Sequence, residues 1–157
     1  MIVAHGGFEV KMDNIKAIFM DLDGTVLTSG HKVSKNLIKK LRELEGKGVK
    51  TFVATGRTFV EMLGIKNPVI NYNGGRVVNP LNSEVIFEKP VEAQDVEELI
   101  KVSREKGIHL NLYMDDKLYI EHETEEGEKY SESVEIPYYV RNFDEFISKS
   151  STKALFI

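Results

Sequence analysis

The chain has 157 residues, a mass of 17.8 kDa and a formal net charge of −4, which suggest about one domain of ordinary size. A hydrophobic content of 41% argues against intrinsic disorder. The acidic balance argues against nucleic acid as the main ligand, because nucleic-acid binders carry a basic patch or stripe. No apolar run approaches the roughly 20 residues of a membrane-spanning helix. We therefore expect neither nucleic acid nor a membrane as a partner.

The sequence contains no cysteine, which excludes disulfides, thiol nucleophiles and cysteine-ligated zinc. A chain without cysteine suits a reducing compartment. Residues 1–10 lack the basic start, the apolar stretch and the cleavage site of a secretion signal. We therefore expect a cytoplasmic protein.

The first half of the chain alternates between strand and helix patterns. The expected elements are a strand at 15–20, a helix capped by Ser34 with Leu37, Ile38, Leu41 and Leu44 on one face and stopped by Gly46 and Gly48, a strand at 49–54, a short helix to about residue 63, and a strand at 69–71. The nearly continuous apolar run at 15–20 is typical of a strand covered on both faces. This alternation predicts right-handed βαβ crossovers and an α/β fold with a parallel sheet.

Beyond residue 75 the pattern becomes antiparallel. The expected elements are a hairpin at 76–79 and 84–88, a helix at 92–106, a half-exposed hairpin at 108–114 and 118–120, a short helix from Asn142 to Ile147, and a strand at 152–157. The acidic stretch at 121–135 predicts a solvated helix face. The chain thus divides into an α/β half, residues 1–88, and a mixed α+β half, residues 89–157.

The clearest candidate site follows the first strand, where Asp21 and Asp23 precede Gly24. Open parallel sheets bind ligands beyond the carboxyl ends of their strands. Residues two apart in an extended chain point the same way, and two close carboxylates repel, which favours a hard cation such as Mg²⁺. One carboxylate could then attack phosphorus while the other transfers protons. Gly24 permits a sharp turn after the pair.

Three other interpretations of this aspartate pair are weaker. A calcium loop starting at Asp21 needs glycine at its sixth position and glutamate at its twelfth, where the sequence has Val26 and Lys32. The manganese-binding Asp-x-Asp of sugar transferases fits the spacing but not the strand before it or the Gly-Thr after it. A turn or helix cap with two surface acids would explain an isolated Asp-x-Asp, and the apolar strand before this one disfavours that reading.

Polar residues also follow the second and third strands. Thr55, Gly56 and Arg57 suit phosphate binding through hydroxyl and backbone N–H donors, with a common strand-to-helix turn as the alternative. Arg57 could pair with a phosphate or a carboxylate, or lie in solvent. Asn73, followed by two glycines, predicts either a substrate-facing loop or an ordinary turn.

The segments Phe19-Met20-Asp21-Leu22-Asp23-Gly24-Thr25, Thr55-Gly56-Arg57 and Asn73-Gly74 together resemble the haloacid dehalogenase (HAD) superfamily of phosphatases, in its Cof-type branch. They are similar to that family's first motif, its second motif and the loop before its cap. The resemblance extends over nearly the whole chain from about Asn14. It implies that residues 1–88 are the N-terminal part of a Rossmann-like core with a parallel sheet. Residues 89–157 would be an inserted, incomplete α+β cap.

By this resemblance, Asp21 is the nucleophile that forms an aspartyl-phosphate and also binds Mg²⁺. Asp23 would be the general acid/base, with its backbone carbonyl touching the metal, and Thr55 would hold the phosphoryl oxygens. The full set of expected substrate or phosphate contacts is Gly24, Thr55, Gly56, Arg57 and Asn73. The implied activity is hydrolysis of small phosphorylated metabolites such as sugar phosphates. A non-catalytic remnant or subunit that binds phosphate ligands is the alternative, and a phosphomutase is a less favoured one.

The family's third motif is a lysine that follows the cap, and its fourth is a Gly-Asp-rich segment. The sequence ends at Ile157 before either, so we expect a C-terminally truncated chain. Lys153 opens a strand that matches the cap and is disfavoured as that lysine, and Asp115-Asp116 is interpreted as a hairpin turn. An uncovered edge of the first strand would pair with a second copy or a complementary C-terminal chain. Residues 1–11 have no family counterpart, which favours Met12 over Met1 as the start.

Overall fold

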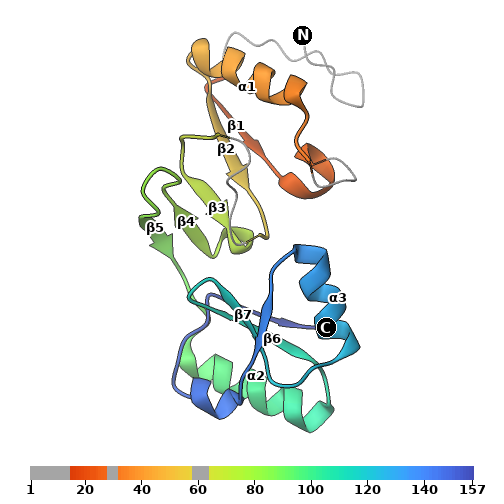
Figure 1. Cartoon of the computed structure of the whole chain (residues 1–157). Coiled ribbons are helices and arrows are strands. Elements are labelled where there is room, and N and C mark those ends of the chain that lie inside the picture. The colour runs from red at the N-terminus through yellow and green to blue at the C-terminus, as the bar shows by residue number, and fades with distance from the viewer. Residues whose placement is uncertain (1–14, 28–31, 58–63) are drawn as a thin grey trace.

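The computed structural model describes residues 15–27, 32–57 and 64–157, and the structural statements below refer to these residues. Two separate β-sheets organise the chain (Figure 1). The first sheet has the strand order β1-β2-β3-β4-β5, and the second has the order β8-β7-β6-β9. The chain passes from one sheet to the other between β5 and the helix α2.

The first sheet confirms the expected parallel arrangement. Its strands are β1 (Ala17–Met20), β2 (Lys50–Ala54), β3 (Val69–Asn71), β4 (Arg76–Val78) and β5 (Val85–Glu88). The strands β1, β2 and β3 are parallel, and the hairpin of β4 and β5 extends the sheet in antiparallel fashion. Helix α1 (Lys35–Gly46) connects β1 to β2. It begins where expected, because the Ser34 hydroxyl accepts a 3.1 Å hydrogen bond from the backbone N–H of Leu37.

The first strand differs from its expected burial on both faces. Phe19 is 61% exposed and stacks on Phe52, with ring centroids 4.7 Å apart. Along β1, Ala17 and Phe19 are exposed while Ile18 and Met20 are half-buried. Within the described ranges β1 is an edge strand, and only one of its faces is covered. The apolar run indicates a sheet interior, but burial depends on which elements cover that sheet.

The second half is built from two hairpin strands, two helices and two further strands. The elements are α2 (Ala93–Lys106), β6 (Leu110–Met114), β7 (Lys117–Ile120), α3 (Glu125–Val134), β8 (Tyr138–Val140), the helical turn η4 (Phe143–Phe146) and β9 (Lys153–Phe156). Helix α2 ends at Gly107, which has a φ of 64°. The Asn142 side chain accepts from the backbone N–H of Asp144 at 2.9 Å, which confirms the expected cap.

Strand β6 is more buried than its alternating pattern indicates. We expected a half-exposed strand, but all five of its residues are buried. Leu112 belongs to one apolar cluster together with Val96 of α2, while Tyr113 belongs to another, which Tyr130 of α3 packs against. The polar face of the strand is therefore covered by a helix rather than by water, so the expectation of half exposure was wrong.

One strand of the second half was not expected from the sequence, and one expected turn makes contacts that were not expected. The three-residue strand β8 pairs in parallel with β7, and its short, partly exposed sequence carries no alternation that would predict it. The turn Asp115-Asp116 has positive φ values of 51° and 57°, as a two-residue hairpin turn requires, which confirms the predicted turn. The Asp116 carboxylate also accepts hydrogen bonds from Tyr72 Oη at 2.9 Å and from Arg76 Nη1 at 2.6 Å. Asp116 thus joins the two halves of the chain.

Two expectations, the short helix reaching residue 63 and Met12 as a translation start, lie outside the described residues. Among the helices that the structure describes, none has both the length and the apolar character needed to cross a bilayer.

Replacing Leu22 with alanine is expected to lower the free energy of unfolding by about 2–5 kcal/mol, because a buried leucine is removed from a packed cluster. Leu22 is 1% exposed and packs in a cluster with Val53 and Val69 of the neighbouring strands. Leu81, 71% exposed, provides the matched control, and its replacement by alanine is expected to change stability by less than about 0.5 kcal/mol. Urea unfolding curves measure both variants. Equal stability losses would contradict the assignment of Leu22 to the core.

Candidate active site

The aspartate pair lies at the carboxyl end of β1. Asp21 directly follows the strand, and Asp23 lies within the helical turn η2 (Leu22–Val26). Both have extended backbone angles, with φ and ψ of −78° and 153° at Asp21 and −75° and 123° at Asp23. Leu22 between them is buried while both aspartates are exposed. The two carboxylates therefore leave the chain on the same solvent-facing side.

Gly24 ends this segment with a φ of 73°, in the left-handed region that favours glycine. The turn redirects the chain immediately after Asp23. The loop can therefore present both carboxylates while Leu22 and Val26 stay buried beneath them.

The structure brings Arg57 onto Asp23. Arg57 Nε lies 3.1 Å from each carboxylate oxygen, and Nη2 lies 2.8 Å from Oδ1. The side chains are 13% and 51% exposed, respectively. These hydrogen bonds raise the pKa of the Arg57 guanidinium, opposed by its partial burial. The sequence left a phosphate, a carboxylate or solvent as the partner of Arg57, and the structure shows a carboxylate. Arg57 contacts both oxygens of Asp23, and this contact orients the Asp23 carboxylate.

The loops after β2 and β3 are tied together beside this pair. Thr55 is 3% exposed, and its hydroxyl oxygen accepts from the Arg57 N–H at 3.2 Å. The backbone N–H of Asn73 donates to the Thr55 carbonyl at 3.1 Å. A Cβ on Gly56 would lie 2.8 Å from Asn73 Oδ1, so a larger residue would displace the Asn73 side chain. The second and third polar strand ends therefore meet, as neighbouring ends of a parallel sheet must.

A pocket of about 250 Å³ opens between the two halves of the chain. Asp23, Gly56 and Arg57 line it from the first half, and Tyr113, Tyr130 and Lys153 are among the residues that line it from the second. Lys153 does lie in the second sheet, as expected, yet it lines the same pocket as Asp23. Sequence reasoning missed the two tyrosines, because no local motif marks them.

The donors at the aspartate pair suit a magnesium ion. Mg²⁺ prefers oxygen ligands, keeps several waters, and typically takes one or two protein carboxylates plus substrate phosphate. The exposed Asp21 carboxylate and the adjacent Asp23 carbonyl are such oxygen donors. In the part of the chain described here, no cluster of three or more Asp, Glu or His side chains could hold a metal ion by itself. The residues present therefore fit a partly hydrated, substrate-shared Mg²⁺.

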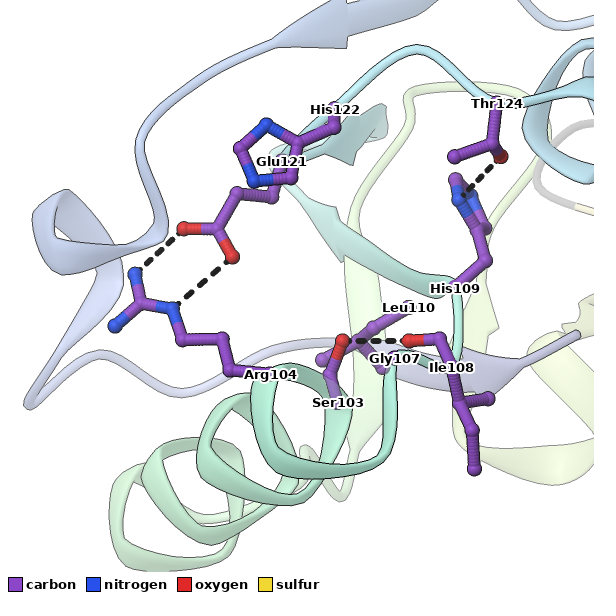
Figure 2. A pocket seen from close by; sticks show the side chains of 9 residues that line it. All are labelled: Ser103, Arg104, Gly107, Ile108, His109, Leu110, Glu121, His122 and Thr124. Carbon is purple, nitrogen blue, oxygen red and sulfur yellow. Dashed lines mark hydrogen bonds and ion pairs between the residues drawn. The ribbon is translucent and has the colours of Figure 1, made fainter.

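A second pocket, of about 290 Å³, lies in the second half beside the C-terminal end of α2 (Figure 2). Figure 2 shows Arg104 paired to Glu121 and Thr124 hydrogen-bonded to His109. The Arg104 guanidinium lowers the pKa of the Glu121 carboxyl. None of the sequence-predicted site residues lines this pocket, and its charged groups already satisfy one another.

The comparisons with known proteins agree on one family of hydrolases. A model of haloacid dehalogenase-like hydrolases matches residues 18–157. A Streptococcus pyogenes protein assigned as a candidate phosphatase is 27% identical over 155 residues, covering 92% of this chain and 58% of the relative. The pyridoxal phosphate phosphatase YbhA of Escherichia coli is 29% identical over 115 residues, covering 69% of this chain and 42% of the relative.

Solved structures agree with the sequence comparisons. The crystal structure of a Thermotoga maritima protein superimposes with a TM-score of 0.74 at 28% identity, covering 91% of this chain and 56% of that one. The chain thus spans only part of the length of these relatives, from 42% of YbhA to 58% of the Streptococcus protein. The family match over residues 18–157 includes all three polar strand ends and both sheets. The chain belongs to the haloacid dehalogenase-like hydrolase family.

Proposed function

We propose that the protein is a Mg²⁺-dependent phosphatase that hydrolyses phosphomonoesters of small metabolites through a phosphorylated Asp21. Residues 1–88 would contribute the catalytic part and residues 89–157 the cap. The observation that carries this proposal is the meeting of Asp21, Asp23 and the Thr55–Arg57 loop at one end of a parallel sheet, in a chain of this family. Open α/β sheets bind their ligands at this end.

The proposed reaction has two steps, each centred on the chain's own residues. In the first, a carboxylate oxygen of Asp21 attacks phosphorus, the ester P–O bond breaks, and Asp23 protonates the departing alcohol. In the second, Asp23 takes a proton from a water that attacks the acyl-phosphate, which releases phosphate and restores Asp21. The Thr55 hydroxyl and the loop N–H groups hold the phosphoryl oxygens. Bound magnesium would supply positive charge that offsets the repulsion between the carboxylate and the phosphate.

In the structure, the Asp23 carboxylate is held in an ion pair by Arg57. Asp23 accepts three hydrogen bonds from Arg57, which occupy the carboxylate face that must carry a proton in the first step. Proton donation by Asp23 therefore requires Arg57 to release at least one carboxylate oxygen. An incoming phosphate offers Arg57 an alternative anionic partner of suitable geometry. We infer that substrate binding exchanges the Asp23–Arg57 contact for an Arg57–phosphate contact.

The proposed substrate class rests on the size and position of the pocket. Its volume of about 250 Å³ lies just below the usual range of ligand pockets and suits a small metabolite rather than a polymer. The relative YbhA is a pyridoxal phosphate phosphatase, which is consistent with a small phosphorylated substrate. The overall charge of −4 gives no support to a nucleic-acid substrate.

Hydrolysis of a chromogenic aryl phosphate by the purified protein tests this proposal. We expect turnover with Mg²⁺, and a fall of about 100-fold or more when EDTA removes the metal, because a lost Lewis acid costs several kcal/mol of transition-state stabilisation. Restored turnover on adding excess Mg²⁺ controls for unfolding. A well-folded protein without turnover would contradict the proposal and favour a phosphate-binding subunit. Conversion of a sugar phosphate to its isomer without phosphate release would favour a mutase.

A further inference from the structure

Three residues of the second half form what we call the cap cluster: Lys153 of β9, Tyr113 of β6 and Tyr130 of α3. Lys153 and Tyr113 are direct partners across the antiparallel strands β6 and β9. Lys153 Nζ lies 5.4 Å from the Tyr113 ring centroid and 5.9 Å from that of Tyr130. It also donates to Tyr130 Oη at 3.2 Å. Two aromatic faces and a hydrogen bond therefore hold the ammonium group in one position.

The ammonium of Lys153 has no carboxylate partner among the ion pairs within the described ranges. It is half-buried, and its hydrogen-bond acceptor is a neutral phenol. The other cation of the pocket, Arg57, is paired with Asp23. Lys153 therefore leaves a positive charge on the cap side of the pocket. An anionic ligand could form a charge-assisted hydrogen bond with this ammonium group.

The hydrogen bonds of the cap cluster leave donors to spare. Tyr113 Oη donates to Tyr130 Oη at 3.0 Å, and Lys153 donates to the same oxygen. Burial and the bond to Tyr130 raise the pKa of Tyr113, which keeps its hydroxyl protonated as a donor. Because both lone pairs of the Tyr130 oxygen are then used, its own O–H has to donate elsewhere, and two Lys153 N–H groups also remain. The cluster offers three donors and a positive charge.

This arrangement shares one pocket with the aspartate site. The transferred phosphate would lie against Asp23, Gly56 and Arg57, which line the pocket from the first half. The cap cluster lines the same pocket from the second half. A substrate whose phosphate binds at the strand ends would extend its leaving group toward Lys153. We propose that the cap cluster binds a second anionic group, a carboxylate or another phosphate, on the leaving group of the substrate. This inference rests on the proposed function for the position of the first phosphate.

A matched series of three-carbon compounds tests the proposal. Glycerol 3-phosphate, 3-phosphoglycerate and glycerol 1,3-bisphosphate differ at the far carbon, which carries a hydroxyl, a carboxylate or a phosphate. Calorimetric dissociation constants are measured in an Asp21→Asn background, so that hydrolysis does not interfere. We expect at least one of the two compounds that carry a second anionic group to bind about tenfold more tightly than glycerol 3-phosphate, because hydrogen bonds to charged groups are strong. The compound that shows this preference identifies the anion as carboxylate or phosphate.

The variant Lys153→Met is expected to reduce this preference to about one, because the charged donor to the second anionic group is removed. Lys149→Met is the matched control, because Lys149 also lies over an aromatic ring, 5.6 Å from the Phe146 centroid, but lines a different pocket. It should retain the preference. If Lys153→Met does not fold, as judged by thermal melting, Tyr130→Phe removes the spare hydroxyl donor and should reduce the preference several-fold.

Equal binding of all three compounds, or a preference that survives in Lys153→Met, would overturn the proposal. The proposed function fails in a different way. If the unmodified protein has no phosphatase activity but shows a Lys153-dependent binding preference, the proposed phosphatase function is refuted and the proposed anion site stands. Turnover of phosphomonoesters without a Lys153-dependent preference would refute the anion site and leave the phosphatase.

Discussion

The variant Asp21→Asn is expected to lower kcat toward an aryl phosphate by about 10⁴–10⁶-fold, the range typical of removing a reacting nucleophile or its activating partner. An amide cannot form the acyl-phosphate, whereas its size and the exposed position of Asp21 let the fold persist. In the unmodified protein, acid quenching during turnover should trap a chain that is heavier by one phosphoryl group. Steady-state rates and intact-mass spectrometry measure the two effects.

The control for this variant is Asp115→Asn. Asp115 is exposed in the turn between β6 and β7 with a φ of 51°, a conformation that asparagine adopts readily. It should keep both activity and phosphorylation. An Asp21→Asn protein that retains a tenth of the wild-type rate or still traps the phosphoryl group would show that another residue is the nucleophile.

The variant Asp23→Asn is expected to lower kcat by about 10²–10⁴-fold for alkyl phosphates, since a poor alcohol leaving group needs a general acid. A good aryl leaving group needs no proton, so its first step should be less affected. In the proposed mechanism, the second step still uses Asp23 as a base. We therefore expect Asp23→Asn to accumulate phosphorylated Asp21 with an aryl phosphate. Rapid-quench measurements of the initial burst and of the later steady rate separate the two steps.

Asp144→Asn is the matched control, because Asp144 also pairs with an arginine, 2.9 Å from Arg104 Nη2, and is 59% exposed against 51% for Asp23. It removes a comparable ion pair away from the candidate site and should leave both steps unchanged. Equal losses on aryl and alkyl phosphates, without accumulation of the phosphorylated chain, would assign Asp23 an orienting role through Arg57 instead.

Local patterns were sufficient for most of the secondary structure. The Ser34 cap, the stop at Gly107 and the Asp115-Asp116 turn were all predicted, because each depends on backbone preferences within a few residues. The strand β8 was missed, since three partly exposed residues carry too little periodicity. Local pattern also misjudged burial in both directions, with β1 more exposed and β6 more buried than expected. Burial depends on which elements cover a strand, and that information is not local.

The candidate site likewise combines features that a local segment encodes with contacts between distant residues. The aspartate pair and the two polar loops could be predicted from the sequence as site candidates, because each occupies a short segment at a strand end. The pairing of Arg57 with Asp23, 34 residues away, and the contact of Lys153 with Tyr130, 23 residues away, depend on the three-dimensional arrangement and could not be predicted from the sequence. The tertiary structure also places Lys153 in the pocket of Asp23. Side chains from distant segments meet only through the pairing of strands and the contact between the two halves, so no local motif can encode their partnership.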